Sequence, residues 1–415
     1  MNINKSQVCV VIGASHAGVN FAFNLRREGW EGDIILYDVD TEFPYHRPPL
    51  SKAYLNSEQG TGQSLLFPKE NYATDNITLK LGISVVSINR ANKSILLSDG
   101  SVQSYDKLVI ATGARPFIPP IKGIDSATNI FPMRTAEDAV NIRKTFNKSI
   151  KKRVVVIGGG YIGLETAASL KKLGANVVVL EREERILARV TAPVMSNFFA
   201  QLHNKKGVKV LTGKNVVAIE QQNDCNMVVC DDDTHFEADL IVVGVGIKVN
   251  TELAQGAGLD IENGIKVNEA ARTNDENIYA IGDCTYHYNP HYDCFLRLES
   301  VQNAVDQGKV AAAAICGQSV SYDAIPWFWS DQFDVKLQMV GISKGYDDIV
   351  VRNEDAENSF SAWYFKDEKL LAVDAVNFAK AYVLGTRFIK SGQKLDKSKL
   401  KDITIPFKPD SFLAE

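Results

Sequence analysis

An internal repeat limits the fold of this chain more than any other feature of its sequence. Residues 8–38 and 153–181 each contain an apolar strand, a glycine-rich turn, a helical stretch, a helix-ending glycine and a second apolar strand that ends in a carboxylate. Uniformly apolar strands such as 154–157 are typical of a parallel sheet that is buried on both faces. The repeat therefore predicts an α/β fold that contains two similar strand–helix–strand units.

The glycines of each copy have the spacing of a dinucleotide-binding loop. The first glycine permits a tight turn, a small middle residue lets the backbone approach a pyrophosphate, and the last glycine lets the helix pack on the strand. The phosphates then lie at the positive end of that helix, and the terminal carboxylate binds a ribose. The second copy has Gly158, Gly160, Gly163 and Glu181, and the first has Gly13, Ser15, Gly18 and Asp38. Two copies predict two dinucleotide sites, and a glycine-rich turn of an unrelated α/β protein is the alternative.

Two such sites could hold two nicotinamides, or a flavin and a nicotinamide. Residues 278–284 form an apolar strand that ends at Asp283, whose carboxylate can bind the ribitol hydroxyls that FAD has and NAD lacks. Residues 107–113 form another strand, which closes on Thr112 and Gly113, where a backbone turn can lie against a pyrophosphate. Each ending is common by itself, but their order around the repeat favours the flavin.

Length and composition set the broad class. A chain of 415 residues is too long for one core and predicts two or three domains. Its net charge of -4 gives no footprint for nucleic acid, so no such partner is expected. The apolar run at residues 8–12 is too short for a signal segment, and no stretch approaches the ~18 apolar residues of a membrane span. We therefore expect a cytoplasmic protein without a membrane partner.

The cysteines predict neither a metal site nor a redox pair. Six are scattered along the chain without a CxxC pair, so no metal is expected. Cys225 and Cys230 have a spacing that some flavoprotein disulfide reductases use on a helix beside the flavin. Here they bracket a segment that looks like a strand followed by an acidic turn, which favours a structural role.

Taken in order, these motifs resemble the FAD-dependent NAD(P)H:ferredoxin reductases of oxygenase systems. The resemblance covers nearly the whole chain and rests on the first glycine loop and on RPPLSK (47–52), ATG (111–113), GGGYIGLE (158–165), IGD (281–283), RLESVQNA (297–304) and PWFWSDQ (326–332). It implies a glutathione-reductase-type fold with two Rossmann-like domains and a C-terminal α+β domain. The implied limits are 1–114 with 247–324 for FAD, 115–246 for NAD and 325–415 for the C-terminal domain.

The resemblance also implies a function. The enzyme would pass electrons from NADH through FAD to a [2Fe-2S] ferredoxin that supplies an oxygenase, with a cytochrome P450 expected. A rubredoxin reductase of an alkane hydroxylase system is the nearest alternative. A thiol-based NADH peroxidase or disulfide reductase and an NADH-sensing binding flavoprotein are further alternatives. A monomer or weak dimer is expected.

Two residues are assigned to the chemistry by the same resemblance. Lys52 would lie beside flavin N5, where a cation stabilises the negative charge of the reduced ring. Glu165 would lie near the nicotinamide amide and near Lys52. The alternatives are a solvated lysine after a turn and a carboxylate that merely favours the helix dipole.

The remaining implied contacts divide between the two coenzymes. Asp40 competes with Asp38 for the adenosine ribose, and core packing is the alternative for Trp329. For FAD the residues are Gly13, Ser15, Ala17, Gly18, Asp38, Arg47, Lys52, Val85, Ala111, Thr112, Gly113, Arg134, Gly282, Asp283, Val301 and Trp329. For NAD they are Gly158, Gly160, Ile162, Gly163, Glu165, Glu181 and Gly246.

Charge patterns bear on the donor and the acceptor. A 2′-phosphate would meet three glutamates, Glu181, Glu183 and Glu184, with only Arg182 and Arg185 to offset them, which favours NADH over NADPH. Residues 376–408 contain eight Lys and Arg against two Asp, a net +6. This basic segment suits an acidic ferredoxin, although such a run is usually solvated surface.

Overall fold

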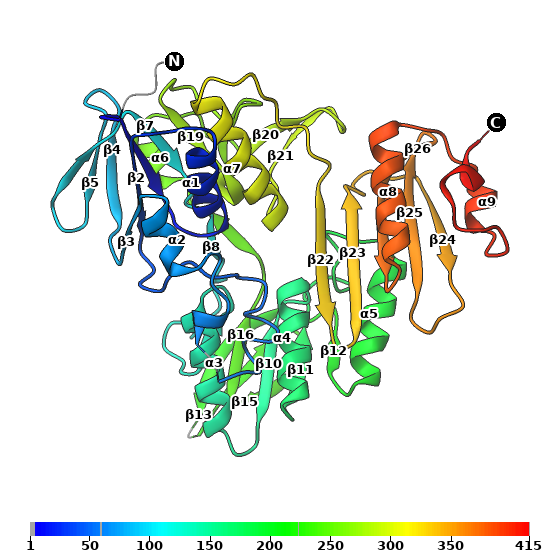
Figure 1. The fold of residues 1–415 in the computed structure, drawn as a ribbon. Coiled ribbons are helices and arrows are strands. Elements are labelled where there is room, and N and C mark those ends of the chain that lie inside the picture. The colour runs from blue at the N-terminus through cyan, green and yellow to red at the C-terminus, as the bar shows by residue number, and fades with distance from the viewer. Residues whose placement is uncertain (1–4, 59, 223, 415) are drawn as a thin grey trace. The chain divides into compact units, whose positions relative to one another are not determined.

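The structure is a computed structural model that describes residues 5–58, 60–222 and 224–414. Its residues form two compact units (Figure 1). Unit 1 contains the chain up to His46, Thr61–Arg115 and Lys248–Phe328, and unit 2 contains Arg47–Gly60, Pro116–Ile247 and the chain from Trp329. No helix among the described residues is long and apolar enough to cross a membrane.

Unit 1 is built around the first copy of the repeat. Its five-stranded sheet has the order β19-β7-β1-β2-β3, and every pair in it is parallel. The strands of this sheet are β19 (Ile278–Ala280), β7 (Lys107–Ile110), β1 (Val8–Ile12), β2 (Asp33–Asp38) and β3 (Ile77–Leu81). The repeat itself consists of β1, α1 (His16–Arg27) and β2. The predicted parallel sheet is confirmed here, because β1 is apolar throughout and is covered on both faces.

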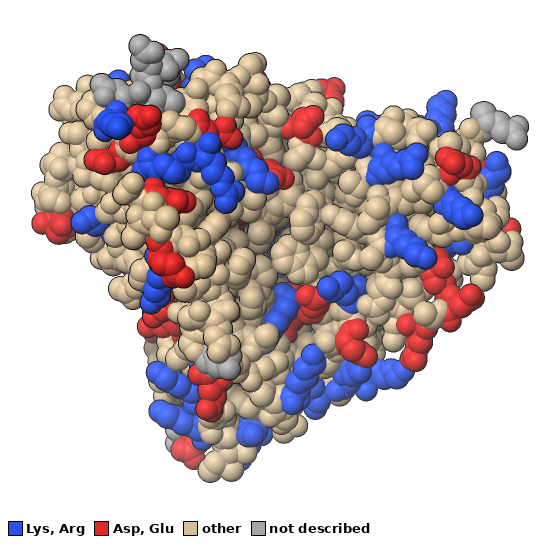
Figure 2. Space-filling model, viewed as in Figure 1, with Lys and Arg blue, Asp and Glu red and all other residues tan. Residues whose placement is uncertain are grey.

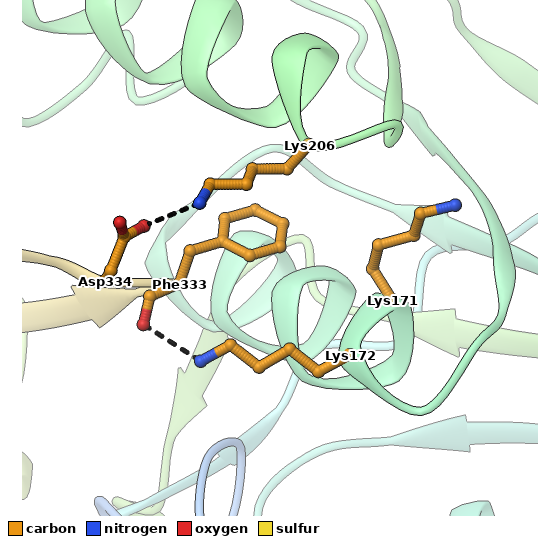
Figure 3. Close-up of a pocket in the computed structure, with 5 residues that line it drawn as sticks. All are labelled: Lys171, Lys172, Lys206, Phe333 and Asp334. Atoms are coloured by element: carbon orange, nitrogen blue, oxygen red, sulfur yellow. Dashed lines mark hydrogen bonds and ion pairs between the residues drawn. The ribbon is translucent and has the colours of Figure 1, made fainter.

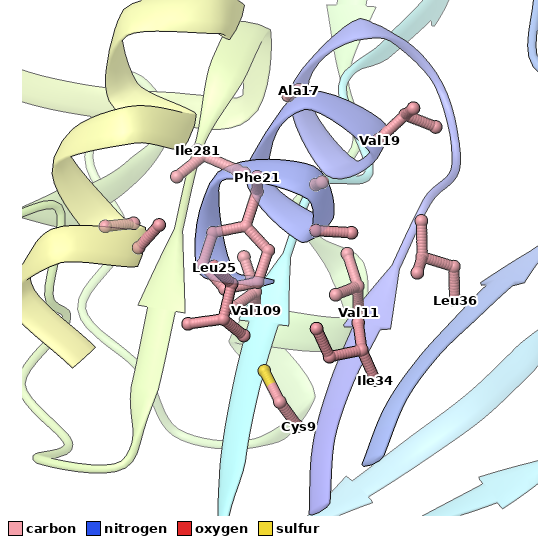
Figure 4. Close-up of a cluster of buried hydrophobic side chains, with 14 of the residues drawn as sticks. Cys9, Val11, Ala17, Val19, Phe21, Leu25, Ile34, Leu36, Val109 and Ile281 are labelled. Carbon is pink, nitrogen blue, oxygen red and sulfur yellow. The ribbon is translucent and has the colours of Figure 1, made fainter. Parts of the chain in front are cut away.

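The core of unit 1 lies where α1 packs against this sheet and against α7 (Val301–Ile315). Figure 4 shows Phe21 and Leu25 of α1 beside Val11 and Val109 of the sheet. Gly308 lets the two helices approach closely, since a Cβ at this position would lie 3.1 Å from the Phe21 nitrogen. This packing fixes the start of α1 at the edge of the sheet where β1 ends.

Smaller elements complete unit 1. One antiparallel sheet contains β4 (Val85–Asn89), β5 (Ser94–Leu97) and β6 (Val102–Ser104). A mixed sheet contains β18 (Ile265–Val267), which pairs in parallel with β20 (Thr285–Asn289), and β21 (Cys294–Leu296), which is antiparallel to β20. The short helices are α2 (Lys69–Thr74), α6 (Glu252–Gly256), η1 (Thr61–Gln63) and η2 (Gly282–Cys284). Two of the crossings between the units lie in β8 (Ala114–Pro116) and β17 (Ile247–Val249).

Unit 2 repeats the architecture around the second copy. Its parallel sheet has the order β12-β11-β10-β16-β9, so β10 lies at the centre as β1 does in unit 1. The strands are β12 (Lys209–Leu211), β11 (Asn176–Leu180), β10 (Arg153–Ile157), β16 (Leu240–Val243) and β9 (Ile130–Pro132). The helices are α3 (Ala136–Lys148), α4 (Tyr161–Lys172) and α5 (Pro193–Lys205), and a meander is formed by β13 (Val216–Gln222), β14 (Cys225–Cys230) and β15 (His235–Ala238).

The C-terminal part of unit 2 is a five-stranded sheet of the order β22-β23-β26-β25-β24. It contains β22 (Trp327–Gln332), β23 (Val335–Gly341), β24 (Asp348–Asn353), β25 (Phe360–Lys366) and β26 (Lys369–Val376). Figure 1 shows α8 (Ala379–Ser391) across the face of this sheet, and α9 (Lys397–Lys401) and η3 (Pro409–Phe412) follow. Two Rossmann-like folds with a C-terminal α+β domain, as expected, therefore make up the chain.

The contact-based units differ from the three domains expected from the sequence. Residues 47–60 group with unit 2, partly because Arg143 donates to the backbone oxygens of Tyr54 and Ser57. The C-terminal sheet groups with the second repeat rather than alone. Compact units need not coincide with domains, so the three-domain limits stay a prediction.

Candidate coenzyme sites

The first glycine loop joins β1 to α1 in a conformation that only glycine adopts easily. Gly13 has a φ of +109°, and a Cβ on it would collide with the backbone oxygen of Ala111. A Cβ on Gly18 would collide with the Gly13 oxygen, so the helix packs directly on the turn. Ser15 is the N-cap residue of α1 and has extended backbone. The substitution of serine for glycine at the middle position is therefore compatible with the loop.

The second loop, between β10 and α4, has the same geometry. Gly158 has a φ of +108°, and a Cβ there would collide with the Gly244 oxygen. A Cβ on Gly163 would collide with the Gly158 oxygen, whereas a Cβ on Gly160 would come no closer than 3.9 Å to its neighbours. The middle position thus faces open space, as a cradle for a pyrophosphate requires.

A carboxylate closes each loop in the same way. Asp38 Oδ2 accepts a hydrogen bond of 2.5 Å from the Ala14 N–H, and Glu181 Oε2 accepts one of 2.6 Å from the Gly159 N–H. Asp40 instead accepts from the Tyr45 hydroxyl at 3.0 Å and from the backbone N–H of Glu42. Asp38, and not its rival Asp40, therefore corresponds to Glu181 of the second copy.

The other strand ends of unit 1 converge on the first loop. Ala111 N–H donates to the Ile12 oxygen at 2.8 Å, and the Ile281 N–H donates to the Ile110 oxygen at 3.0 Å. A Cβ on Gly282 would lie 3.0 Å from the Cβ of Ala17. The sequence assigned these segments to the same coenzyme, and Asp283 lies within η2 directly after Gly282.

Thr112 and Gly113 are held by a residue that sequence reasoning did not single out. Asn250 donates from Nδ2 to the Thr112 oxygen, accepts at its own oxygen from the Thr112 hydroxyl, and donates its N–H to Gly113. The separation of 138 residues leaves no local signal for this pairing. Asn250 therefore fixes the turn that was expected to face a pyrophosphate.

Two more predicted FAD contacts of unit 1 lie at suitable termini. Val301 is the first residue of α7, so its N–H belongs to the turn whose donors have no partner inside the helix. Val85 begins β4, and the nearby Ile83 N–H donates to the Asp38 oxygen at 3.0 Å. A backbone contact at Val301 and an adenine contact at Val85 remain predictions.

The other predicted contacts belong to unit 2. Arg47 donates from Nη1 to the Arg134 oxygen at 2.8 Å, so these two lie together. Ile162 is 42% exposed in the first turn of α4, and Gly246 has a φ of +126°. Trp329 is half-buried in β22.

Lys52 and Glu165 form an ion pair within unit 2. Lys52 Nζ lies 2.6 Å from Glu165 Oε2 and also donates to the Pro48 oxygen at 3.1 Å. The Glu165 side chain is 2% exposed and that of Lys52 is 20% exposed. The ion pair therefore has one buried partner and one that reaches solvent, and the reading of Lys52 as a merely solvated lysine does not fit this geometry.

Sequence reasoning missed two serines that hold Glu165. The Ser51 hydroxyl donates to Glu165 Oε2 at 2.6 Å, and the Ser330 hydroxyl donates to Oε1 at 2.7 Å. Both serines lie inside motifs that the sequence marked, RPPLSK and PWFWSDQ. The signal was present in those motifs, but nothing in the sequence indicated which side chain the serines would meet.

Cys284 lies among the predicted FAD contacts of unit 1, whereas the spaced pair Cys225 and Cys230 lies in the meander of unit 2. Cys225 and Cys230 are the two ends of β14, and all six cysteines are free. A strand rises about 3.3 Å per residue, so their separation far exceeds the span of a disulfide. Burial also raises the pKa of the Cys230 thiol. Among the described residues no group of three His, Cys, Asp or Glu side chains could hold a metal ion.

The basic C-terminal segment is partly neutralised. Lys397 pairs with Asp348 and Glu368, and Lys399 lies 3.7 Å from Asp396. Figure 2 shows Lys and Arg side chains over the surface formed by this part of the chain, with Asp and Glu between them. The segment is basic in composition but is not a continuous positive face in this view.

The chain is similar to known proteins along most of its length. Residues 7–308 match the sequence model described as pyridine nucleotide-disulphide oxidoreductase, and residues 327–409 match the model described as reductase C-terminal. The chain is 42% identical to putidaredoxin reductase CamA of Pseudomonas putida, over 98% of this chain and 97% of that protein. It is 37% identical to rubredoxin-NAD(+) reductase of the same organism, over 89% and 96% of the two chains.

A solved structure extends the likeness to three dimensions. The ferredoxin reductase for the CYP199A2 system from Rhodopseudomonas palustris superimposes with a TM-score of 0.94 at 37% identity, over 98% of this chain and all of that one (100%). FAD and NAD(H), the coenzymes of the family, fit the two loops, whose middle positions are small and whose carboxylates are suited to ribose. The chain is thus an oxidoreductase that belongs to the pyridine nucleotide-disulphide oxidoreductase family.

Proposed function

We propose that this flavoenzyme is an NADH:ferredoxin reductase that transfers electrons from NADH through FAD to a [2Fe-2S] ferredoxin. The observation that carries this proposal is the pair of matched loops, each closed by a strand-end carboxylate. One loop per coenzyme is the requirement of such a reaction, because both dinucleotides must be bound at the same time.

The site residues are part of the proposal. The loop of residues 13–18 with Asp38, Val85, residues 111–113, Gly282, Asp283 and Val301 would bind FAD, together with Arg47, Lys52, Arg134 and Trp329. The loop of residues 158–163 with Glu165, Glu181 and Gly246 would bind NAD(H). The corresponding domain limits are 1–114 with 247–324, 115–246 and 325–415.

When bound, the nicotinamide supplies a hydride and the flavin accepts it and releases electrons to the acceptor. The residues of this protein orient the coenzymes and neutralise their charge. Lys52 brings a cation that the Pro48 oxygen and Glu165 hold in one direction. A fixed cation of this kind stabilises the negative charge of a reduced flavin without reorganising during the reaction. Glu165, with both oxygens occupied by donors, would orient the nicotinamide end.

The acceptor follows from what similar proteins serve. One relative is a reductase of putidaredoxin and another is a ferredoxin reductase of a CYP system, which supports a ferredoxin that feeds a cytochrome P450. The similarity to rubredoxin-NAD(+) reductase supports rubredoxin as the second candidate. The positions of Cys225 and Cys230 at opposite ends of β14 argue against a thiol relay between them.

The donor and the setting complete the proposal. Glu181 directs both oxygens at its own loop and turn, towards Gly159 and Glu183, so a 2′-phosphate would meet a fixed negative charge. NADH is therefore preferred over NADPH. A cytoplasmic location and a monomer or weak dimer are retained from the sequence as expectations.

Acceptor assays test this function. The purified protein should contain flavin that NADH bleaches within the dead time or the first seconds of a stopped-flow trace. Reduction of cytochrome c should require added ferredoxin and should not respond to rubredoxin. A response to rubredoxin alone would favour the second candidate, and bleaching over minutes with a change of oligomeric state would favour an NADH sensor.

A further inference from the structure

A buried chain of polar side chains leads away from Glu165. Ser330 Oγ, which donates to Glu165 Oε1, is itself 3.2 Å from Gln332 Nε2. Gln332 Oε1 in turn lies 2.9 Å from His203 Nε2. Ser330, Gln332 and His203 are all fully buried. These three residues, which we call the serine–glutamine–histidine chain, come from β22 and the end of α5.

The carboxylate end fixes the direction of every hydrogen bond in this chain. An ionised carboxylate only accepts, so the Ser330 hydroxyl must donate to Glu165 and accept from the Gln332 amide. The Gln332 oxygen then faces His203, which must donate from Nε2. All donors therefore point one way, towards Glu165.

The chain is matched to a neutral histidine. His203 Nδ1 is buried and has no hydrogen-bond partner among the described residues, so a proton there would be unsatisfied. Burial lowers the pKa of His203 to about 4. With the proton held on Nε2, the imidazole is a donor to Gln332 throughout the neutral pH range.

Strand geometry explains why β22 can supply two members. Ser330 and Gln332 are two residues apart, so their side chains leave the same face of the strand. The ring of Phe333, the next residue, packs edge-on against His203 at 5.0 Å. Figure 3 shows Phe333 in the wall of a pocket of about 360 Å³ between Lys206 and the lysines at the end of α4. Phe333 therefore lies between this pocket and His203, the last member of the serine–glutamine–histidine chain.

Other charged groups around Glu165 do not duplicate this restraint. Lys52 and Ser51 both bind Oε2. Burial, followed by the charges of Asp374 and Glu165, raises the pKa of the Tyr161 hydroxyl on the same helix. Ser330 is the group that holds Oε1. Without it, one oxygen of a buried carboxylate would lose its donor and the side chain could rotate about its terminal bond.

We propose that Ser330, Gln332 and His203 are positioning residues that fix the Glu165 carboxylate in the orientation needed at the nicotinamide end of the NADH site. This inference rests on the proposed function, since it assigns support to a residue placed in that site. It adds a reason for the C-terminal sheet to belong to the reaction, because β22 supplies two of the three residues.

Ser330→Ala is the first test. The rate of flavin reduction at saturating NADH should fall about tenfold, the usual effect of removing one hydrogen bond to a charged group. The dissociation constant of NADH should change less than about threefold, because the glycine loop and Glu181 still bind the adenosine half. Ser330→Thr, which keeps the hydroxyl, should restore the rate. A crystal structure of Ser330→Ala should show Glu165 turned from its contact with Lys52.

A double-mutant cycle with Glu165→Gln separates positioning from a general loss of stability. If Ser330 acts through Glu165, Ser330→Ala should cause little further loss in the Glu165→Gln background. Ser361→Ala is the matched control, because Ser361 is an equally buried serine of the same sheet that bonds only to Trp363 among the contacts described. It should lower the melting temperature without changing the saturating rate.

Additive losses, or a normal rate with Ser330→Ala, would overturn the inference. If Ser330→Ala fails to fold, Gln332→Leu is the alternative variant, because it keeps the side-chain volume but removes the middle member of the serine–glutamine–histidine chain. The rate of flavin reduction should then fall about threefold. An unchanged rate in that variant would equally reject the proposal. Failure of the proposed function is distinguishable, since the unmodified protein would then give no ferredoxin-dependent reduction of cytochrome c, or would be bleached by NADH only over minutes.

Discussion

The two copies of the repeat have nearly the same backbone but different surroundings. The first glycines have φ values of +109° and +108°, and each loop is closed by its own acid. Four residues after the first glycine, Ala17 is 8% exposed, whereas Ile162 is 42% exposed. The glycines therefore fix the cradle, and the side chains of the first helical turn decide what can cover it.

The two copies also differ in the residue seven positions after the first glycine. Asn20 donates to the His16 oxygen of its own helix, whereas Glu165 is bound by three side chains from other elements of unit 2. Because the Asn20 side chain bonds within its own helix, the first copy has only a binding loop at this position. Because other elements hold the Glu165 side chain, the second copy has a fixed charged group that can act on a substrate.

Replacing the last glycine of either loop by alanine should have the largest effect on coenzyme binding. Gly18→Ala should abolish flavin retention, and Gly163→Ala should spare the flavin and abolish NADH binding, because each Cβ would collide with a loop oxygen. The flavin spectrum and calorimetric titration with NADH measure these effects. Gly256→Ala, at a position with nothing within 4 Å, is the control. Loss of flavin from Gly163→Ala would reverse the assignment of the two loops.

The sheet beside the second copy should give unit 2 its own pH dependence. Burial raises the pKa of Asp374 from its ordinary value of 3.8 to about 7, and its Oδ2 accepts from the Tyr364 hydroxyl at 2.5 Å. Because the folded state holds this proton more tightly, its contribution to stability is present below pH 4 and is lost as pH rises to 7. Asp374→Asn should stabilise the protein by about 2 kcal/mol at pH 8 and by little at pH 4.

Chemical denaturation at the two pH values measures this difference. A gain for Asp374→Asn that is the same at pH 4 and pH 8 would contradict the titration of Asp374. Ser359→Ala, a change at a buried residue that directly precedes β25, should show no such dependence on pH.

Removing the strand-end carboxylate of either copy should have a smaller effect on coenzyme binding. Glu181→Ala should weaken NADH binding about tenfold and narrow its preference over NADPH, because a carboxylate near the ribose is removed. Asp38→Ala should lower flavin affinity and leave that preference unchanged. Glu357→Ala serves as the control, since its exposed side chain pairs only with Lys205 among the ion pairs of the described residues. Equal effects of Glu181→Ala and Asp38→Ala on coenzyme preference would remove the distinction between the copies.

The smallest effect on turnover is expected for the two cysteines of β14, which lie outside both copies of the repeat. Replacing Cys225 and Cys230 together by serine should leave ferredoxin-dependent turnover within about twofold, because the two thiols lie at opposite ends of β14. A large loss of turnover in steady-state assays would restore the thiol-based alternative. Cys294→Ser, at an exposed position, provides a comparison for nonspecific effects.

Local patterns in the sequence were sufficient for much of this fold. The apolar runs of β1 and β10 and the glycines that follow them predicted both parallel sheets, and the strand at Cys225–Cys230 is confirmed. The choice between Asp38 and Asp40 needed coordinates, because two residues in one turn have the same chemistry. The partners of Glu165 also needed coordinates, since Ser330 is 165 residues away and no periodicity links it to the helix.

The interrupted path of the chain has a consequence for biosynthesis. The sheet of unit 1 is completed only when Ile278 pairs with Leu108, whereas the parallel sheet of unit 2 needs no residue beyond 243. As the polypeptide leaves the ribosome, we expect the second glycine loop, the proposed NAD(H) site, to fold while the proposed FAD site still lacks an edge strand. Flavin would thus be captured late, and nascent chains released before residue 280 would be nucleotide-competent but colourless.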